Sequence, residues 1–127
     1  MKDKIIVVED NIELSDLLGT LLTHEGYQVK SLLDAANLKN VIDDYQPDLL
    51  LMDLWIEPVN ANEIIEEMRQ ESKFKDLPII LVSAADNLEE ICLECGANCF
   101  VKKPFDFGYL VSRIEKCLGD KPDKATY

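Results

Sequence analysis

The sequence predicts an α/β fold in which helices cover both faces of a parallel β-sheet. Short apolar runs of strand length alternate with longer segments whose apolar residues recur at the helical period. This alternation is typical of successive βα units, because parallel strands need crossover connections. The length of 127 residues and the hydrophobic content of 47% are sufficient for one core. We therefore expect a single domain over residues 1–127, with its core at about 4–118 and a polar tail at 119–127.

Two strands, each followed by a helix, are predicted in the first third of the chain. The apolar residues 4–8 form the first strand. Asn11 can cap the first helix, which carries a regular stripe of leucines and ends at Gly26. Residues 27–31 form a short second strand, and Asp34 can cap the helix that follows it.

The central part of the chain predicts two buried strands on either side of a third helix. Pro47 ends the second helix, and residues 48–53 form a strand whose three consecutive leucines indicate burial on both faces. Pro78 opens the fourth strand, at residues 79–82. The third helix is marked by apolar side chains at helical spacing, namely Ile64, Ile65 and Met68.

A fourth helix, a fifth strand and a fifth helix complete the pattern. Asp86 with Glu89 three residues later is typical of a capping box, and Gly96 ends the helix that follows. Residues 99–102 form the last strand, and Asp106 begins the last helix. Right-handed crossovers favour a doubly wound, five-stranded, flavodoxin-like sheet of order 2-1-3-4-5. In that order ligands bind beyond the carboxyl ends of strands 1 and 3, where the winding reverses.

The charge balance argues against several classes of partner. The chain has 13 Lys and Arg against 25 Asp and Glu, a net charge of −12, so phosphate backbones and anionic membrane surfaces repel it. The carboxylates instead suit a hard divalent cation. No apolar run is long enough to span a bilayer, and residues 1–4 lead directly into a strand rather than a signal peptide. We expect a soluble, cytoplasmic protein that binds neither nucleic acid nor membranes directly.

The four cysteines are expected to be reduced thiols in or near the core. Cys92, Cys95 and Cys99 form a C-x2-C-x3-C pattern, which taken alone suggests a metal or redox site. Cys92 and Cys95 fall on one apolar helical stripe, however, and Cys117 falls on another, as expected of Cys that packs as a small hydrophobe. His24, the only histidine, is far away for a fourth zinc ligand. As a phosphoryl carrier it is also a weak candidate, because one His near a helix C-terminus more often complements the dipole.

Polar side chains gather where the predicted strands end, at the carboxyl edge of the sheet. In chain order they are Glu9 and Asp10 after the first strand, Asp53 at the end of the third, Ser83 and Ala84 after the fourth, and Lys103 after the fifth. Clustered carboxylates repel one another unless a cation intervenes, and a few hard oxygen ligands favour Mg²⁺. Asp53, nearest the switch point, is the best candidate for a nucleophile that forms an aspartyl-phosphate. The Ser83 hydroxyl and the Ala84 N–H could donate to a phosphoryl oxygen, and Lys103 could supply positive charge.

Each of these residues also has an ordinary structural interpretation. Glu9 and Asp10 could be only a charge pair at a helix N-terminus, Ser83 a turn residue and Lys103 a solvated cation. What favours a phosphate and metal site is that all of them lie at the same edge of one sheet.

The motifs resemble those of response-regulator receiver domains of two-component signalling. The similarity covers about residues 4–118, through Val-Val-Glu9-Asp10-Asn11, Leu-Met-Asp53-Leu, Val-Ser83-Ala84 and Phe100-Val-Lys-Lys103-Pro104-Phe. It implies that Asp53 is the phosphoacceptor and that Asp10, Asp53 and the backbone carbonyl of Trp55 bind Mg²⁺, with Glu9 assisting through water. It also implies that Ser83 contacts the phosphoryl group, that Lys103 pairs with it, and that a cis peptide before Pro104 aims this lysine.

The resemblance further implies a phosphoacceptor signalling domain, not an enzyme in the usual sense. A sensor histidine kinase or a phosphotransfer protein would donate the phosphoryl group to Asp53. Phe100 matches the aromatic residue whose rotamer reports phosphorylation. A downstream protein would then bind the face formed by the fourth helix, the fifth strand and the fifth helix.

Several positions depart from the family pattern. Glu9 stands where many relatives have Asp, Glu57 where Pro is usual and Ala61 where Gly is usual. We therefore expect the loop after the third strand to follow an unusual path that places a further carboxylate near the metal. Phe100 lacks the phenol hydroxyl of many relatives, and Trp55 is a bulky choice at a position that tunes the lifetime of the phosphoryl group.

Two other functions fit the residues less well. A receiver-like interaction module that works without phosphorylation would be favoured by the loss of Asp53 or Lys103, and both are present. A flavin-binding electron carrier of similar topology needs a hydroxyl- or glycine-rich phosphate loop after the first strand. Glu9 and Asp10 stand there instead and would repel a phosphate.

Overall fold

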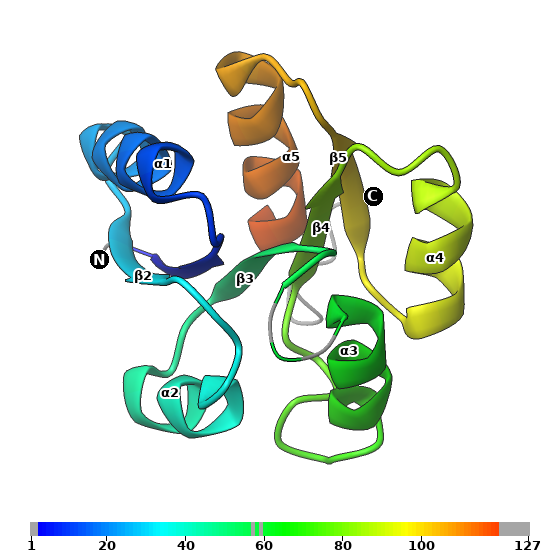
Figure 1. Ribbon diagram of the computed structural model, residues 1–127. Coiled ribbons are helices and arrows are strands. Elements are labelled where there is room, and N and C mark those ends of the chain that lie inside the picture. Colours follow the sequence, from blue (N-terminus) through cyan, green and yellow to red (C-terminus); the bar gives the residue numbers. More distant parts are fainter. Residues whose placement is uncertain (1–2, 57, 59, 120–127) are drawn as a thin grey trace.

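The computed structural model is a five-stranded parallel sheet with helices on both faces (Figure 1). It describes residues 3–56, 58 and 60–119. The elements in these ranges are β1 (Lys4–Val8), α1 (Ile12–His24), β2 (Gln28–Leu32), α2 (Leu38–Tyr45), β3 (Leu49–Asp53), α3 (Ala61–Arg69), β4 (Ile79–Ser83), α4 (Leu88–Cys95), β5 (Cys99–Lys102) and α5 (Phe107–Gly119). The strand order is β2-β1-β3-β4-β5 with every pair parallel, which confirms the predicted doubly wound topology.

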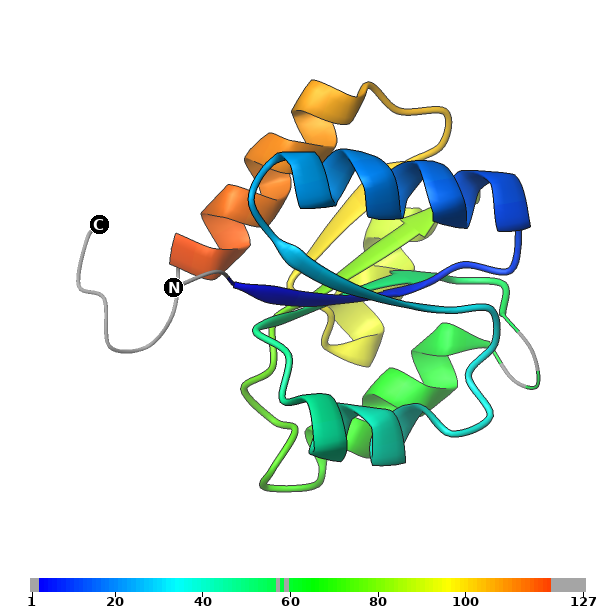
Figure 2. The same cartoon turned by 90° about the vertical axis from the view of Figure 1, so that its left-hand side faces the viewer.

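The sheet separates two layers of helices. Figure 2 shows α1 and α5 on one face and α2, α3 and α4 on the other. Each face has its own apolar cluster, and alternate residues of the central strands supply both. Ile6, Leu50 and Met52, for example, pack on the side of α2, α3 and α4, whereas Leu49 and Leu51 pack on the side of α1 and α5. All five residues of β3 are buried, as the run of leucines predicts.

Several of the predicted helix ends are confirmed. The Asn11 side chain accepts a hydrogen bond from the Leu14 N–H at 2.9 Å and caps α1. Gly26 and Gly96 follow the ends of α1 and α4 with φ of 103° and 91°, a backbone conformation that costs other residues energy. Asp106 accepts from the Tyr109 N–H at 3.2 Å at the start of α5.

Two predicted N-caps are wrong, and β2 and β4 each extend one residue further than expected. Asp34 does not cap α2, which begins after Asn37; its carboxylate accepts from the Ala36 N–H at 3.0 Å and stabilises the turn before the helix. Asp86 forms no capping box, because α4 begins after Asn87, whose side chain makes no capping hydrogen bond. The Asp86 carboxylate is fully exposed and lies 3.6 Å from the Lys102 ammonium.

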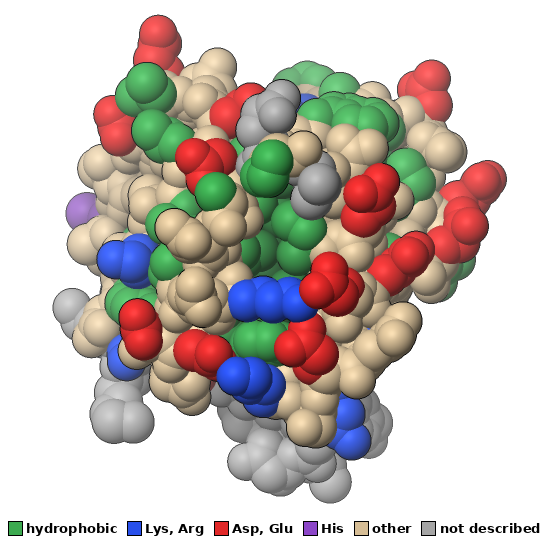
Figure 3. All heavy atoms as spheres, turned by 60° about the horizontal axis from the view of Figure 1, so that its bottom comes forward, with side chains coloured by type: hydrophobic (Ala, Val, Ile, Leu, Met, Phe, Trp, Pro, Cys, Tyr) green, Lys and Arg blue, Asp and Glu red, His purple; other side chains and the backbone are tan. Residues whose placement is uncertain are grey.

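Acidic and basic side chains alternate on the surface near α2 and α3. Figure 3 shows basic side chains between acidic ones on the face at the bottom of Figure 1. Lys39 of α2 pairs with Glu67 and Glu71, and Lys73 pairs with Asp43 at 2.9 Å. Such solvated pairs contribute little stability each. Within the described ranges, no helix combines the length and the apolar content needed to cross a bilayer.

Candidate functional site

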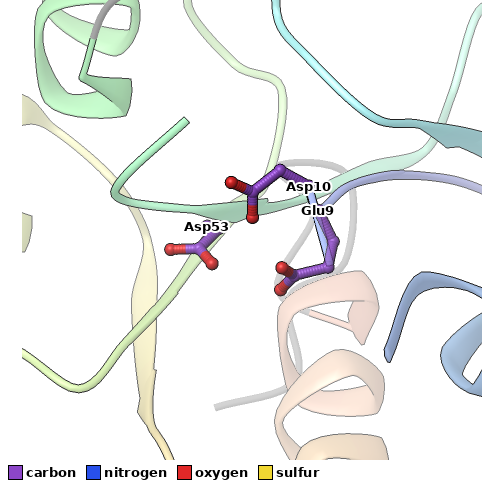
Figure 4. Close-up of side chains that lie close together, drawn as sticks. All are labelled: Glu9, Asp10 and Asp53. Atoms are coloured by element: carbon purple, nitrogen blue, oxygen red, sulfur yellow. The ribbon is translucent and has the colours of Figure 1, made fainter. Parts of the chain in front are cut away.

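Three carboxylates converge at the carboxyl edge of the sheet. Glu9 and Asp10 directly follow β1, and Asp53 is the last residue of β3 (Figure 4). The strand register brings them together. Val8 of β1 pairs with Met52 of β3, and the next residue along each strand is an acid, Glu9 after Val8 and Asp53 after Met52. One oxygen from each of the three side chains lies within 4.8 Å of the others. The predicted convergence of these residues is therefore confirmed.

Lys103 joins the carboxylates from the other side of the site. Its Nζ lies 2.8 Å from Asp53 Oδ2 and 3.0 Å from Glu9 Oε1. The Lys103 N–H donates to the Ser83 carbonyl at 2.9 Å, which fixes the backbone from which the side chain extends. The peptide bond between Lys103 and Pro104 is cis, as predicted.

Glu9 is buried, and its carboxylate is held by two donors. Oε2 accepts from the Asn11 N–H at 3.1 Å and Oε1 from the Lys103 ammonium. Burial raises the pKa of Glu9 above its usual value of 4.5, and the nearby charge of Asp53 adds to this rise, whereas Lys103 and the Asn11 N–H oppose it. Burial lowers the pKa of Lys103, but its bonds to Asp53 and Glu9 outweigh that effect and leave the pKa raised. The Glu9–Lys103 contact is thus an ion pair in a site that still carries excess negative charge.

Asp53 is fixed by donors on both of its oxygens. Its Oδ1 accepts from the Trp55 N–H at 3.1 Å, and its Oδ2 accepts from Lys103. The residue is only 7% exposed, whereas Asp10 beside it is exposed to solvent. The site is therefore open on the side of Asp10 and closed on the side of the strands.

The residues of this site fit a divalent cation. Three carboxylates against one ammonium leave a net charge of −2 if all four groups are ionised, and hard oxygen ligands are those that Mg²⁺ prefers. Asp10, the exposed member of the three, leaves room for water, which Mg²⁺ usually retains in its coordination shell.

The remaining predicted site residues lie around these four. Ser83, at the end of β4, is buried, and its Oγ accepts from the Ala85 N–H at 3.1 Å, while Ala84 between them is exposed. Trp55 is 56% exposed on the loop after β3. Phe100 of β5 is half-buried and packs on the apolar cluster beneath α4.

Of two positions that depart from the family pattern, the structure describes Ala61 but not Glu57. Ala61 is fully buried as the first residue of α3, and its N–H donates to the Leu54 carbonyl at 2.9 Å. The prediction that Glu57 lies near the metal concerns a residue outside the described ranges and stays a prediction. His24 is exposed in the last turn of α1.

One contribution to the site is not evident from side-chain patterns. The Asn11 N–H binds the Glu9 carboxylate, although the sequence indicates only a helix cap at this position. A sequence signal could reveal this contact. Asn11, a helix cap, directly follows the acidic residues Glu9 and Asp10, so the turn into the helix brings the Asn11 N–H close to the Glu9 carboxylate.

Comparisons with known proteins point to one family. The sequence model of the family described as "Response regulator receiver domain" matches residues 5–115. The response regulator ArlR of Staphylococcus aureus is 34% identical over 124 residues, which are 95% of this chain and 55% of ArlR. The chain thus spans about half the length of the curated relatives it matches.

Solved structures share the fold. The receiver domain of NtrX from Brucella abortus superposes with a TM-score of 0.82 at 26% identity, over 92% of this chain and 99% of the NtrX domain. The chemotaxis response regulator CheY4 of Vibrio cholerae gives a TM-score of 0.85 at 19% identity, over 92% of this chain and 99% of CheY4. The second likeness supports the fold alone.

Proposed function

Because this chain belongs to the response-regulator receiver domain family, we propose that it accepts a phosphoryl group on Asp53 in a two-component phosphorelay. The observation that carries this proposal is the environment of the Asp53 carboxylate. It ends the central strand, is almost fully buried, and is aimed by the Trp55 N–H and the Lys103 ammonium. A carboxylate held in this way has one defined orientation, as a nucleophile requires.

The metal ligands in this proposal are the carboxylates of Asp10 and Asp53 and the backbone carbonyl of Trp55, with Glu9 acting through water. When bound, Mg²⁺ supplies positive charge that lets an anionic phosphoryl group approach the anionic nucleophile. The acidic cluster supports this assignment, since three carboxylates within 4.8 Å repel one another in the absence of a cation.

The transfer step exchanges one bond for another. An Asp53 oxygen attacks the phosphorus of a phosphohistidine, the O–P bond forms, and the P–N bond breaks with its electron pair going to the imidazole. Lys103 Nζ, which lies 2.8 Å from Asp53 Oδ2, is placed to pair with a phosphoryl oxygen once Asp53 is phosphorylated. The Ser83 hydroxyl and the Ala84 N–H are the further donors that we assign to the phosphoryl oxygens.

We assign the donor and the receiver of the signal by family. The donor is a sensor histidine kinase or a phosphotransfer protein, and the output is a change of affinity for a downstream protein at the face of α4, β5 and α5. Phe100 supports this output surface, because its ring is half-buried on β5 and can change its packing when Ser83 and Lys103 engage a phosphoryl group. The domain would act in the cytoplasm without binding nucleic acid itself.

Labelling with acetyl phosphate tests this function. Intact-mass spectrometry should show one added phosphoryl group in the wild-type protein with Mg²⁺ and none when the cation is chelated. Asp53→Asn should abolish the label. Asp86→Asn is the matched control, because its carboxylate follows β4 at the same edge but is fully exposed and bonds only outside the site in the described structure. Undiminished labelling of Asp53→Asn would refute the assignment, and failure of both acetyl phosphate and a phosphohistidine donor would favour the phosphorylation-independent module.

A further inference from the structure

A second reactive group lies at the other end of β5, away from the acidic site. The Cys99 Sγ accepts a hydrogen bond from the Arg113 Nε at 3.1 Å. Cys99 is the first residue of β5, and Arg113 lies on α5, which covers this face of the sheet. A guanidinium that donates to a sulfur stabilises the thiolate over the thiol, and the thiolate is the nucleophilic form of cysteine.

Cys117 is placed to act on the same sulfur. It follows Arg113 by one helical turn of α5, so both side chains lie on the face that meets β5. Its side chain hydrogen-bonds that of Cys99, and the two residues are buried in one apolar cluster with Val101 and Ile114. The Cys117 side chain and then that of Arg113 lower the pKa of the Cys99 thiol, although burial opposes them.

Cys99 also lies 3.7 Å from a carbonyl, that of Phe100, but the other two thiols accept no hydrogen bond from a cation in the described structure. The Cys92 Sγ donates to the Cys99 carbonyl at 3.1 Å, and the Cys95 Sγ donates to the Cys92 carbonyl at 3.7 Å. Burial raises the pKa of Cys92 to about 12 and also raises that of Cys95. Buried thiols to which no cation donates a hydrogen bond stay protonated and unreactive. The four cysteines therefore divide into an inert pair on α4 and a pair that joins β5 to α5, in which Arg113 activates Cys99.

We propose that Cys99 and Cys117 form a peroxide-sensitive thiol pair, in which Cys99 is oxidised first and Cys117 resolves it as an intramolecular disulfide. The Cys99 thiolate attacks one oxygen of hydrogen peroxide, the O–O bond breaks, and the sulfenic acid forms while hydroxide leaves and is protonated to water. The Cys117 sulfur then attacks the Cys99 sulfur, the S–S bond forms, and a second water leaves. In total, two thiols and one hydrogen peroxide give one disulfide and two waters, with the peroxide as the oxidant.

The product would tie the start of β5 to the last turns of α5. Lys103 follows the other end of β5, so the thiol pair and the phosphoryl site lie at opposite ends of one strand. The disulfide would restrain α5 against the sheet without occupying the acidic site. This pair does not depend on Asp53 chemistry, and the two proposals can fail separately.

Peptide mapping after peroxide treatment tests the proposal. The folded protein is exposed to hydrogen peroxide, unfolded, alkylated and digested. We expect one linked pair of peptides joining Cys99 to Cys117, with Cys92 and Cys95 fully alkylated. In Cys117→Ser, Cys99 should instead be trapped as the sulfenic acid by a 1,3-dione reagent. A link between Cys92 and Cys95, a link between Cys92 and Cys99, or four intact thiols would overturn the proposal.

The contribution of Arg113 is tested by the rate of the reaction. Arg113→Gln should slow oxidation of Cys99 on the order of tenfold, because each unit by which a thiol pKa rises above the ambient pH lowers the thiolate fraction by that factor. Lys116→Gln is the matched control, since it removes an exposed positive charge from the same helix. Equal rates in wild type and Arg113→Gln, with both proteins folded by circular dichroism, would refute activation by Arg113.

Discussion

Replacing Lys103 with Met should destabilise the fold through the carboxylates that it leaves behind. The ammonium makes two charge-assisted contacts, at 2.8 Å to Asp53 and 3.0 Å to Glu9, and its side chain is 25% exposed. Each such contact contributes about 1.5–3 kcal/mol, but partial exposure and the released cost of burying the ammonium offset part of the sum. We expect a net loss of about 2 kcal/mol in the free energy of unfolding, or a fall in Tm of about 8 °C for a domain of this size.

The same substitution should cost much less when the carboxylates are already neutral. In a Glu9→Gln, Asp53→Asn background, Lys103→Met should change stability by less than about 0.5 kcal/mol, because it then removes an uncompensated ammonium. The assay is urea unfolding followed by circular dichroism in buffer without divalent cations. Lys73→Met is the control for an exposed pair, with an expected cost below about 1 kcal/mol. Equal losses in the two backgrounds would refute the ion-pair argument.

Three further results are expected from the same structure. Burial raises the folded-state pKa of Glu9 above its unfolded value of 4.5. The wild type should therefore lose stability as the pH rises from 4.5 through the folded-state pKa, and Glu9→Gln should flatten this dependence in urea titrations. Mg²⁺ should change Trp55 emission, and Trp55→Asn should release phosphate faster, because Trp55 is exposed and its N–H binds Asp53, a proposed metal ligand. Arg69→Met should cost about 3 kcal/mol, because its guanidinium donates to the carbonyls of Gly96, Phe74 and Lys75 and to Asn98.

Each of these expectations has a result that contradicts it. A Glu9→Gln protein with the wild-type pH profile would show that Glu9 titrates alike in the folded and unfolded states. A flat Mg²⁺ titration with equal phosphate release would leave Trp55 as a packing residue only. Thermal unfolding of Arg69→Met within about 1 °C of wild type would show that the four acceptors are satisfied by water instead.

The strands and their order could be predicted from sequence because burial leaves a strong pattern. A strand covered on both faces, such as β3, must be apolar throughout, and its end is marked where Asp53 interrupts the run. The starts of α2 and α4, expected at Asp34 and Asp86, could not be predicted as reliably. An Asx side chain stabilises a turn before a helix as readily as the helix itself, and Asn37 and Asn87 follow close behind.

The acidic site could be predicted because parallel strands end at one edge. Glu9, Asp53 and Lys103 are far apart in the chain, yet each directly follows or ends a strand. Contacts made by backbone groups and by helix side chains leave no comparable signal. The Arg69 bonds to loop carbonyls and the Arg113 bond to Cys99 arise from tertiary packing, and the C-x2-C-x3-C spacing does not include Cys117, whose side chain contacts Cys99.

The position of the phosphoryl group is the most direct test of whether Asp53 is the phosphoacceptor. The protein is phosphorylated with acetyl phosphate and Mg²⁺, and borohydride then reduces the acyl phosphate to an alcohol, which marks the modified aspartate as homoserine in the digested peptide. We expect homoserine at position 53 alone, with none in samples prepared without Mg²⁺. Homoserine at Asp10, or an unmodified Asp53 in a protein that carries the phosphoryl mass, would contradict this assignment.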